Sequence, residues 1–600
     1  MGQIRRISEF LQLICYCIKI LWDTSKRYFV IRMVLNIASL VIPFVVIIVT
    51  RQLINFLAGN STASDAAIQV FLVLSIVLLG CNVFSKAIET ANTYYMGLHQ
   101  DIMDAMTKRL IMEKAAELDL SYFDSAEFYN EMQDAEVNSS LITYSAFRAM
   151  DFIRYFIQFL AAFVYLFQFN YILPIIFVLA VIPYTIVDIK QVAAVYGFQR
   201  EYMAEERKMQ YAADVLLSRE FAKDVRIYNI ASFISGKFQG IWEMLFSKKK
   251  KISLRFTVFL LALLVLPEAA AASFLFFLGL SVIHGGHSVG DFTYLQGLMA
   301  QILGSVYMVV SSYTQLMDGK IRIQNYRKFL GFQNKVSSDG ILPLVGDSFL
   351  VEFCGVSFRY GDALPWILKD VSFSFHSKQK VAFVGVNGSG KTTIVKLLLR
   401  YYEPVEGQIL INGKDIKEYA IDSYRSHFST VFQDYSNYAF TVKESVFLSD
   451  INRADDGGRV MEALRQSGAD AFTADFPYGV DTYLTRRYEE NGQELSGGQW
   501  QKIALARAFF READVYILDE PSASLDAKSE DEVFRMFHKL YEGKGAVLIS
   551  HRLSNVHLSD LIFVLDNGFL AESGTHEELM AAEDVYAYMY RLQAEKYHYM

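Results

Sequence analysis

The stretch "KVAFVGVNGSGKTTIVKLLLRYY", residues 380–402, decides the fold of the C-terminal half of the chain. It contains a short apolar strand, a glycine-rich loop and an amphipathic helix in that order. The loop fits the pattern G-x-x-x-x-G-K-[ST], in which backbone N–H groups surround phosphates and the lysine reaches the β- and γ-phosphate oxygens. We therefore predict a phosphate-binding loop whose nucleotide-contacting residues are Gly385, Asn387, Gly388, Ser389, Gly390, Lys391, Thr392 and Thr393.

A second buried apolar strand, "VYILDE" at residues 515–520, ends in two carboxylates. In an α/β sheet such a strand would bring Asp519 to the crevice that holds the phosphates, where Asp519 and the hydroxyl of Thr392 could hold Mg²⁺. Glu520 could then polarise an attacking water molecule. Acidic residues after a strand can also serve only to cap a helix, but the phosphate-binding loop in the same half favours the catalytic interpretation.

A second glycine-rich helix start lies about a hundred residues later, in "ELSGGQWQKIALARAFF" at residues 494–510. The unpaired N–H groups and the positive dipole end of such a helix attract an anion. One domain thus carries two phosphate-binding features, and the first of them already accounts for its own nucleotide.

The order of the phosphate-binding loop, "LSGGQ" (residues 495–499), "LDE" and a lone histidine at position 551 resembles the ATP-binding cassette family. The whole chain resembles an exporter half-transporter of that family. The resemblance implies ATP and Mg²⁺ as cofactors and a second half-transporter as partner. Cassettes of this family dimerise head to tail, which implies that Ser496, Gly498 and Gln499 contact the ATP held by the partner.

The resemblance assigns roles to four further residues. Tyr360, in "FRYGD", would stack on adenine, although an ordinary strand aromatic is the alternative interpretation. Gln433, in "VFQD", would touch Mg²⁺ and take part in catalysis. Asp526, in "SASLD", would lie at the dimer seam, and His551 would contact the γ-phosphate.

The N-terminal half is much more apolar. The chain is 53% hydrophobic and 20% charged, and six of its segments reach the roughly 20 residues that a membrane-spanning helix needs. These predicted spans are residues 28–57, 66–84, 152–169, 171–187, 256–283 and 292–316. Lysine and arginine are absent from the connections 58–65, 169–171 and 284–291 and frequent on the other side, so both termini and the soluble half are predicted to be cytoplasmic.

We accordingly predict an all-α membrane domain with six spans, followed by an α/β P-loop ATPase domain. The predicted boundaries are residues 1–27 for an interfacial amphipathic helix, 28–330 for the membrane domain, 331–348 for a linker and 349–600 for the cassette. The long cytoplasmic connections are predicted to continue the spans as helices. Residues 121–135 resemble the first coupling helix of these exporters, and residues 218–229 lie near the second.

One segment departs from the family pattern. Just before the signature, exporters usually show a sequence like T-E-V-G-E-x-G, whereas residues 486–492 read "RRYEENG". Glu490 and Gly492 match, but Arg487 and Glu489 do not, which leaves the detailed coupling contacts open.

The predicted function is ATP-driven export by alternating access across a bacterial plasma membrane. A net charge of −8 argues against a nucleic-acid partner. Loose similarity to exporters of lanthipeptides favours a peptide substrate. Multidrug or lipid export is the alternative, and an ATP-gated channel or regulator is disfavoured because the catalytic acid and the signature are intact. Both a homodimer and a heterodimer fit the sequence.

Glu268 lies near the middle of the fifth predicted span, after Pro267. Ionisable groups at such depth are costly and usually face a cavity or a partner. One interpretation is that Glu268 binds a cationic group of the substrate, and the other is that it pairs with a polar group on another span or is protonated. Pro267 is predicted to break the helix.

Overall fold

The computed structural model describes residues 2–59, 64–137, 139–169, 171–336, 339–453, 457–519, 535–550 and 553–598. The chain divides into two compact units. The first comprises Met1–Ala116 and Glu127–Phe332, and the second comprises Glu117–Ala126 and Gln333–Met600. The short segment 117–126 therefore packs with the C-terminal part of the chain, although it lies between two stretches of the helical unit.

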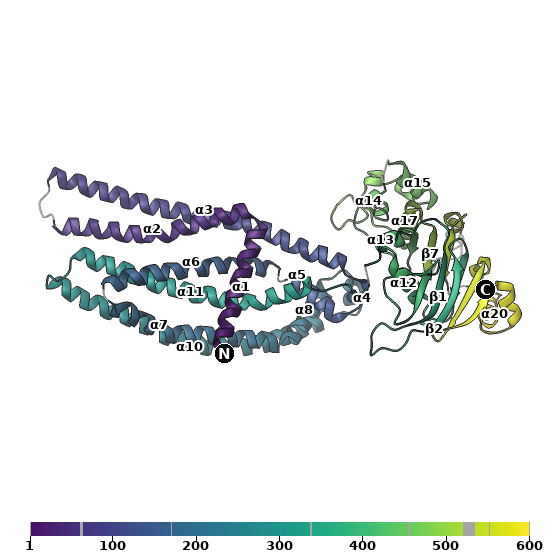
Figure 1. The fold of residues 1–600 in the computed structure, drawn as a ribbon, viewed down its shortest axis with the longest axis horizontal. Coiled ribbons are helices and arrows are strands. Elements are labelled where there is room, and N and C mark those ends of the chain that lie inside the picture. The colour runs from purple at the N-terminus through teal and green to yellow at the C-terminus, as the bar shows by residue number, and fades with distance from the viewer. Residues whose placement is uncertain are drawn as a thin grey trace. The chain divides into compact units, whose positions relative to one another are not determined.

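The first unit is built from long helices (Figure 1). Six of them are long and apolar enough to cross a membrane: α2 (Lys26–Gly59), α3 (Asp65–Glu117), α6 (Ser139–Phe169), α7 (Ile172–Glu201), α10 (Ala231–Ile283) and α11 (Val289–Leu330). The shorter helices are α1 (Gly2–Thr24), α5 (Ala126–Val137), α8 (Met203–Leu217) and α9 (Ala222–Ile227).

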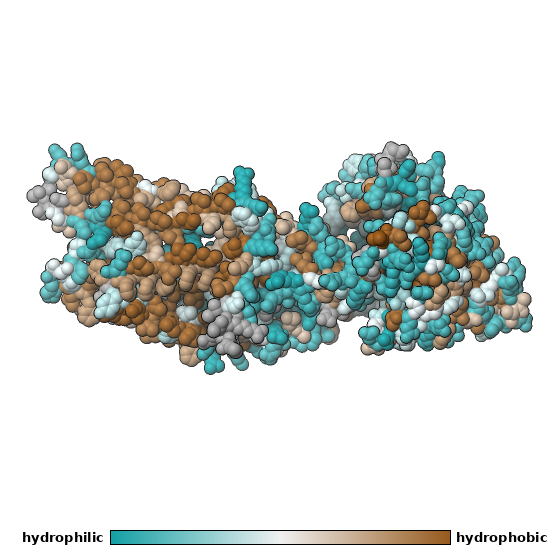
Figure 2. Space-filling model, in the orientation of Figure 1, coloured by the Kyte–Doolittle hydropathy of each residue, from teal (hydrophilic) through white to brown (hydrophobic). Residues whose placement is uncertain are grey.

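The longest helices exceed the thickness of a bilayer, so each has an apolar part and an extension beyond the membrane. α3 and α10 each contain 53 residues, so each is about 80 Å long, whereas the hydrocarbon core of a bilayer is about 30 Å thick. None of the residues in the most apolar stretch of α3 is buried. Figure 2 shows hydrophobic residues gathered on the surface of the long helices, as expected where lipid replaces water.

The helix break predicted at Pro267 is absent, because α10 runs without interruption from Ala231 to Ile283. Pro267 is buried, and α10 packs along α7 and α11. Membrane helices tolerate proline where neighbouring helices satisfy the freed backbone groups, so the proline does not end this helix.

The second unit contains two sheets. The first is antiparallel, with strand order β2-β1-β4-β5: β1 (Leu350–Phe358), β2 (Leu368–His376), β4 (Glu406–Ile411) and β5 (Lys414–Asp415). The second has the order β10-β9-β3-β8-β7-β6: β3 (Lys380–Val384), β6 (Phe428–Val431), β7 (Val515–Asp519), β8 (Gly545–Ile549), β9 (Leu561–Asp566) and β10 (Phe569–Gly574). In this sheet β9, β3, β8, β7 and β6 are parallel, and only β10 is antiparallel to its neighbour.

Helices cover these sheets and form a second core. They are α4 (Leu120–Phe123), α12 (Lys391–Leu398), α13 (Ile421–Ser426), α14 (Val442–Phe447), α15 (Gly458–Gln466), α16 (Asp470–Thr473), α17 (Gly497–Arg511), α19 (His576–Ala582) and α20 (Val585–His598), with short 3₁₀ helices at Ile416–Glu418, Gly479–Asp481 and Leu553–Leu558. An aromatic core fills the space beside both sheets, where Phe373 contacts Phe353, Phe383 and Phe563 at ring-centroid distances of 4.4–5.2 Å. A separate core holds α17 against α14 and α15.

Candidate functional site

Four parallel strands end at one edge of the second sheet and carry described residues of the predicted site there. The phosphate-binding loop follows β3, Gln433 follows β6, and Asp519 is the last residue of β7, while β8 ends at Ile549. The carboxyl ends of neighbouring parallel strands form the crevice in which open α/β sheets bind ligands. This topology gives one location for motifs that lie up to 134 residues apart, between Gly385 and Asp519.

The backbone of the phosphate-binding loop takes a conformation that requires glycine. At Gly385 φ is +150°, and an added Cβ would lie 2.2 Å from the carbonyl oxygen of Leu565. Gly390, the N-cap of α12, also has a positive φ of 105°. The loop is therefore built against β9 and opens onto the N-terminus of α12, which is the end of a helix that favours an anion.

The side chains of the loop are arranged around this opening. Lys391 is buried, and its Nζ donates to the carbonyl oxygens of Gly385 at 3.0 Å and Val386 at 3.1 Å. The hydroxyl of Ser389 is buried and has no hydrogen-bond partner in the part of the chain that the structure describes. A buried hydroxyl and an ammonium group within a glycine-rich loop are groups that phosphate oxygens can satisfy.

Thr392 and Asp519 meet at the same place from different elements. The Thr392 Oγ1 donates to Asp519 Oδ1 at 3.5 Å, and only 4% of Asp519 is exposed. A hydroxyl and a carboxylate side by side are hard oxygen ligands of the kind that Mg²⁺ uses in nucleotide sites, so the residues present fit this ion. Gln433 is exposed at the turn after β6.

Tyr360 belongs to an aromatic corner beside α12. Its ring contacts Phe358 and Tyr402 in T-shaped geometry, at 5.0 Å and 5.2 Å, and Lys396 Nζ lies 5.2 Å from its centroid. Its hydroxyl lies 3.2 Å from Thr393 Oγ1 in the loop. Tyr360 thus stands next to the phosphate-binding loop with 38% of its surface exposed, which leaves room for a flat ring to stack on it.

The signature, residues 495–499, begins α17 and is open to solvent. Ser496 is the N-cap; its Oγ accepts from the Gln499 N–H at 3.3 Å, and the Gln499 side chain in turn accepts from the Ser496 N–H at 2.9 Å. Gly497 and Gly498 are exposed, and a Cβ added to either would meet no atom within 4 Å. The helix terminus is capped by its own side chains, and its two glycines leave its outer face uncovered.

The structure links the signature to the segment after Gln433, a link that the sequence did not reveal. The Tyr435 hydroxyl donates to the carbonyl oxygen of Gly497 at 2.9 Å. Arg507, on α17, donates to the carbonyl oxygen of Ser436 at 2.8 Å. Two hydrogen bonds therefore join α17 to the residues that immediately follow Gln433.

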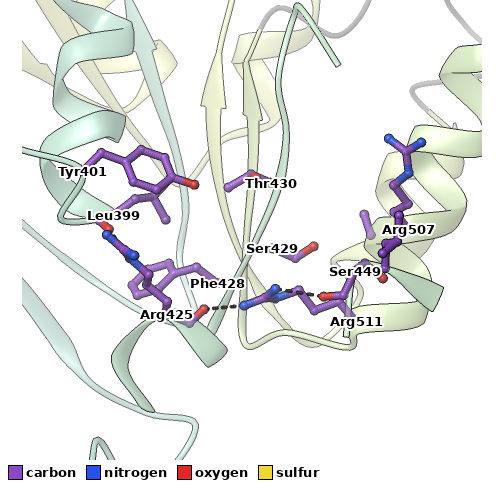
Figure 3. Close-up of a pocket in the computed structure, with 11 residues that line it drawn as sticks. Leu399, Tyr401, Arg425, Phe428, Ser429, Thr430, Ser449, Arg507 and Arg511 are labelled. Carbon is purple, nitrogen blue, oxygen red and sulfur yellow. Dashed lines mark hydrogen bonds between the residues drawn. The ribbon is translucent and has the colours of Figure 1, made fainter. Parts of the chain in front are cut away.

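Next to this link lies a cavity of about 290 Å³ that Arg425, Arg507 and Arg511 line (Figure 3). Arg511 donates to the carbonyl oxygens of Arg425 and Ser449, both at 2.8–2.9 Å, and burial lowers the pKa of Arg425 and Arg507. These guanidinium groups connect α17 to the ends of α13 and α14 through backbone carbonyls. Their only sequence signal is the i, i+4 spacing of the two arginines on α17.

Three of the predicted residues lie outside the described part of the chain: Glu520, Asp526 and His551. Their strands are described, because β7 ends at Asp519 and β8 ends at Ile549. The structure therefore places the strands that lead to the two predicted catalytic residues, and not those side chains.

The segment 117–126 contacts residues of the second unit through several polar bonds. The Asp119 carboxylate accepts from the backbone N–H of Lys335 and, at 2.9 Å, of Val336. The Tyr402 hydroxyl donates to Asp124, and burial together with this bond raises the pKa of Tyr402. Tyr402 therefore touches both this segment and Tyr360.

The departure from the family pattern at residues 486–492 forms a compact turn. Arg486 Nε donates to the Gly492 carbonyl oxygen at 3.1 Å, and a Cβ at Gly492 would lie 1.9 Å from the carbonyl oxygen of Thr485. The turn needs glycine at position 492 because two backbone segments approach closely there. Arg487 and Glu489 are exposed on it.

Glu268 lies on the exposed surface of α10. Its carboxylate lies within electrostatic range of Tyr307 of α11, whose hydroxyl is buried and has no hydrogen-bond partner among the described residues. The Tyr307 ring contacts Tyr184 of α7 at 5.3 Å. A carboxylate and two tyrosines from three membrane helices thus form one polar region.

Residues 368–523 match the family model for the ABC transporter. The chain is 30% identical over 576 residues to the subtilin transport ATP-binding protein SpaT of Bacillus subtilis, covering 95% of this chain and 92% of that protein. It is 25% identical over 577 residues to the nisin transport ATP-binding protein NisT of Lactococcus lactis subsp. lactis, covering 96% and 95%.

A solved structure of a bacterial Atm1-family ABC exporter with ATP bound has the same fold, with a TM-score of 0.82. The two chains are 22% identical, and the match covers 95% of this chain and 98% of the other. The predicted fold class is confirmed: a helical membrane domain with six apolar helices precedes an α/β nucleotide-binding domain.

Proposed function

This chain belongs to the ABC transporter family, and we propose that it exports a peptide as one half of a dimeric transporter. It is an ATP-driven exporter with an ATP-binding domain that hydrolyses ATP. The observation that carries the peptide proposal is the similarity to SpaT and NisT along nearly the whole chain, membrane helices included. A match confined to the nucleotide-binding domain would carry no information about the substrate.

The proposed ATP site is shared between two chains. The phosphate-binding loop of one chain holds the phosphates of its own nucleotide through Lys391 and the backbone. The uncovered N-terminus of α17 in the partner supplies Ser496 and Gly498 to the γ-phosphate from the opposite side. The open space around Gly498 supports this arrangement, because a phosphate group can approach the helix end there.

Hydrolysis in this proposal depends on residues at the strand ends. Thr392, Asp519 and Gln433 would hold Mg²⁺, which would supply positive charge to stabilise the phosphates. Glu520 and His551 orient the attacking water and contact the γ-phosphate, and Asp526 lies at the seam between the two cassettes. ATP favours the closed dimer and hydrolysis reopens it, which satisfies the requirement that a ligand must bind one state more tightly to shift the equilibrium.

Residues 121–135 are proposed to contain the first coupling helix, and the part of them within the segment 117–126 packs with the second unit. Tyr402 supports this role because it connects Asp124 with the aromatic corner at Tyr360, the proposed adenine platform. A change in the position of Tyr360 on nucleotide binding is thereby passed to the loop that joins two membrane helices. The segment 218–229 is proposed as the second coupling helix.

The proposed location is the plasma membrane of a bacterium, with both termini and the cassette in the cytoplasm. The distribution of lysine and arginine between the connections supports this orientation. Residues 28–330 would then form the membrane domain and residues 349–600 the cassette, with 331–348 as a linker.

Glu268 is the proposed contact for a cationic group of the peptide. The carboxylate is exposed, so a positively charged donor could bind to it. We expect Glu268→Gln to lower ATP-dependent uptake of a cationic peptide into inverted vesicles about tenfold.

The matched control is Glu243→Gln, on the same helix, where the carboxylate only accepts from Gln239 at 2.8 Å. The assay compares a cationic peptide with its neutral analogue and with a fluorescent phospholipid. Uptake of the cationic peptide by the wild-type protein supports the proposed function. Transport of the phospholipid but of neither peptide would contradict the proposed function. Equal uptake of the cationic peptide by both variants would show that Glu268 does not recognise the substrate.

A further inference from the structure

Four consecutive lysines, residues 248–251, precede the apolar part of α10. Arg255 follows them, and Glu243 is the only acidic residue between positions 231 and 255. The four lysines lie within one continuous helix that goes on to cross the membrane. They form a concentrated positive charge, named here the lysine cluster.

Part of the lysine cluster borders a cavity of about 550 Å³ between α10 and the end of α7. Lys248 and Lys251 line it, which agrees with the i, i+3 spacing that places two residues on one face of a helix. Four apolar residues from both helices form part of the wall, namely Ala194, Gly197, Phe198 and Ile252, and Glu201 and Tyr202 complete it. The cavity thus has a partly apolar wall and a basic rim.

The charges of the cluster are largely uncompensated. Lys248 Nζ donates to the Tyr202 hydroxyl at 2.8 Å and lies 4.3 Å from the centroid of its ring. Among the residues that the structure describes, no ion pair joins Lys249, Lys250 or Lys251 to a carboxylate. Glu201 also lines the cavity, so one negative charge faces its two lysines. The net charge of the rim stays positive.

The position along the helix identifies the anion that can reach these lysines. The apolar span is predicted to begin at residue 256, so Lys251 and Lys248 lie about 8 and 12 Å before it, at a rise of 1.5 Å per residue. With a headgroup layer of about 5–8 Å on each side, Lys251 lies at its outer edge and Lys248 about 5 Å beyond it, and both are within a Debye length of roughly 8–10 Å of the layer. Lipid headgroups are therefore the anions that are always present at this depth.

We propose that the lysine cluster and the cavity beside it bind the headgroup of an anionic phospholipid. The phosphate is held by Lys248 and Lys251 at the rim, Lys249 and Lys250 add attraction from the same turn, and the apolar wall receives the first carbons of the acyl chains. The proposal uses the cytoplasmic orientation of these residues. It requires neither ATP nor a transported substrate, so its failure is distinguishable from failure of the proposed function.

Native mass spectrometry of the purified dimer tests this proposal directly, with phosphatidylglycerol and phosphatidylcholine of identical acyl chains as probes. We expect the first phosphatidylglycerol to bind at least about fivefold more tightly than phosphatidylcholine, since one basic residue at a membrane surface contributes about 1 kcal/mol. The triple variant Lys249→Gln, Lys250→Gln, Lys251→Gln should lose most of this preference. The triple lysine-to-arginine variant should keep it, because charge and not the ammonium geometry attracts the lipid.

Lys237→Gln is the matched control, because it removes a basic residue of the same helix about 28 Å before the span. It should retain the full preference. Equal binding of both lipids by the wild-type protein, or an unchanged preference in the triple glutamine variant, would overturn the proposal. Displacement of phosphatidylglycerol by millimolar glycerol 3-phosphate would assign the cavity to a soluble anion instead. If the triple variant does not fold, the single variant Lys251→Gln gives the same comparison, with about a fivefold loss expected.

Discussion

The phosphate-binding loop after β3 and the signature before α17 are both glycine-rich starts of helices, yet they are built in opposite ways. The loop is packed against β9, and its lysine is buried against its own backbone. The signature is exposed, and a Cβ added at Gly497 or Gly498 would meet no described atom within 4 Å, while the Gly497 carbonyl oxygen accepts from Tyr435. In the proposed function the loop holds the phosphates of its own nucleotide, whereas the signature contacts a phosphate that the partner's loop holds. On that proposal the difference accounts for the two anion-binding features in one domain.

Replacing one glycine of each region by alanine should have different effects on stability in the two regions. Gly385→Ala forces a Cβ to within 2.2 Å of a carbonyl oxygen, at a positive φ, and should destabilise the cassette by about 2–4 kcal/mol. Gly498→Ala meets no atom and should leave the melting temperature unchanged. Both should lower ATP hydrolysis more than about a hundredfold, since both remove contacts to phosphate oxygens.

Calorimetry and steady-state ATPase assays on the two purified variants measure these outcomes. Gly497→Ala is the matched control for the signature, because it adds the same methyl group in equally open space. An equal loss of stability in Gly385→Ala and Gly498→Ala would contradict the distinction between the two regions.

Glu520→Gln should trap the closed dimer, in which the loop of one chain faces the signature of the other. The amide keeps the shape of the carboxylate but cannot polarise water, so turnover should fall roughly a hundredfold or more while ATP binding is retained. Nucleotide retention after gel filtration shows whether the closed dimer accumulates. Turnover near that of the wild-type protein would show that Glu520 is not the carboxylate that polarises the attacking water.

Tyr435→Phe tests the internal link between the regions with a smaller effect. Removing the bond to the Gly497 carbonyl should reduce turnover about fivefold, since such a bond contributes about 1 kcal/mol. The Hill coefficient for ATP should also fall, because Gln433 serves one nucleotide and the signature serves the other. Tyr435 would then be a positioning residue.

Tyr438→Phe is the matched control, because this exposed tyrosine lies three residues later and keeps its ring contact with Arg507 after the change. A Hill coefficient that stays at the wild-type value in Tyr435→Phe would show that the bond is only structural.

The sequence was sufficient for features that depend on local pattern. The spacing of Gly385, Gly390 and Lys391 predicted a strand, a loop and a helix, and these are β3, the loop and α12. Apolar length predicted six spans, and the structure has six helices that can cross a membrane. In both cases residues near one another in the chain set the structure.

Features that depend on packing were not predictable. α10 continues through Pro267 because neighbouring helices surround that residue. The local sequence does not reveal this packing. The Tyr435–Gly497 bond joins residues 62 positions apart, and the Tyr402–Asp124 bond joins residues 278 positions apart. Such contacts depend on how the sheet and the helices pack. The sequence motifs identify the site residues, but packing determines which hydrogen bonds connect them.

The most direct test of the shared ATP site uses mixed dimers of one chain carrying Lys391→Ala and one carrying Ser496→Ala. If each site combines the loop of one chain with the signature of the other, the mixed dimer has one doubly altered site and one unaltered site. Vanadate trapping of labelled nucleotide in isolated mixed dimers should then give about one nucleotide per dimer, because the trapped state requires a complete phosphoryl-transfer site. Homodimers of either variant should trap almost none. Mixed dimers that trap no more nucleotide than the homodimers would place both regions in one chain's site and contradict the account.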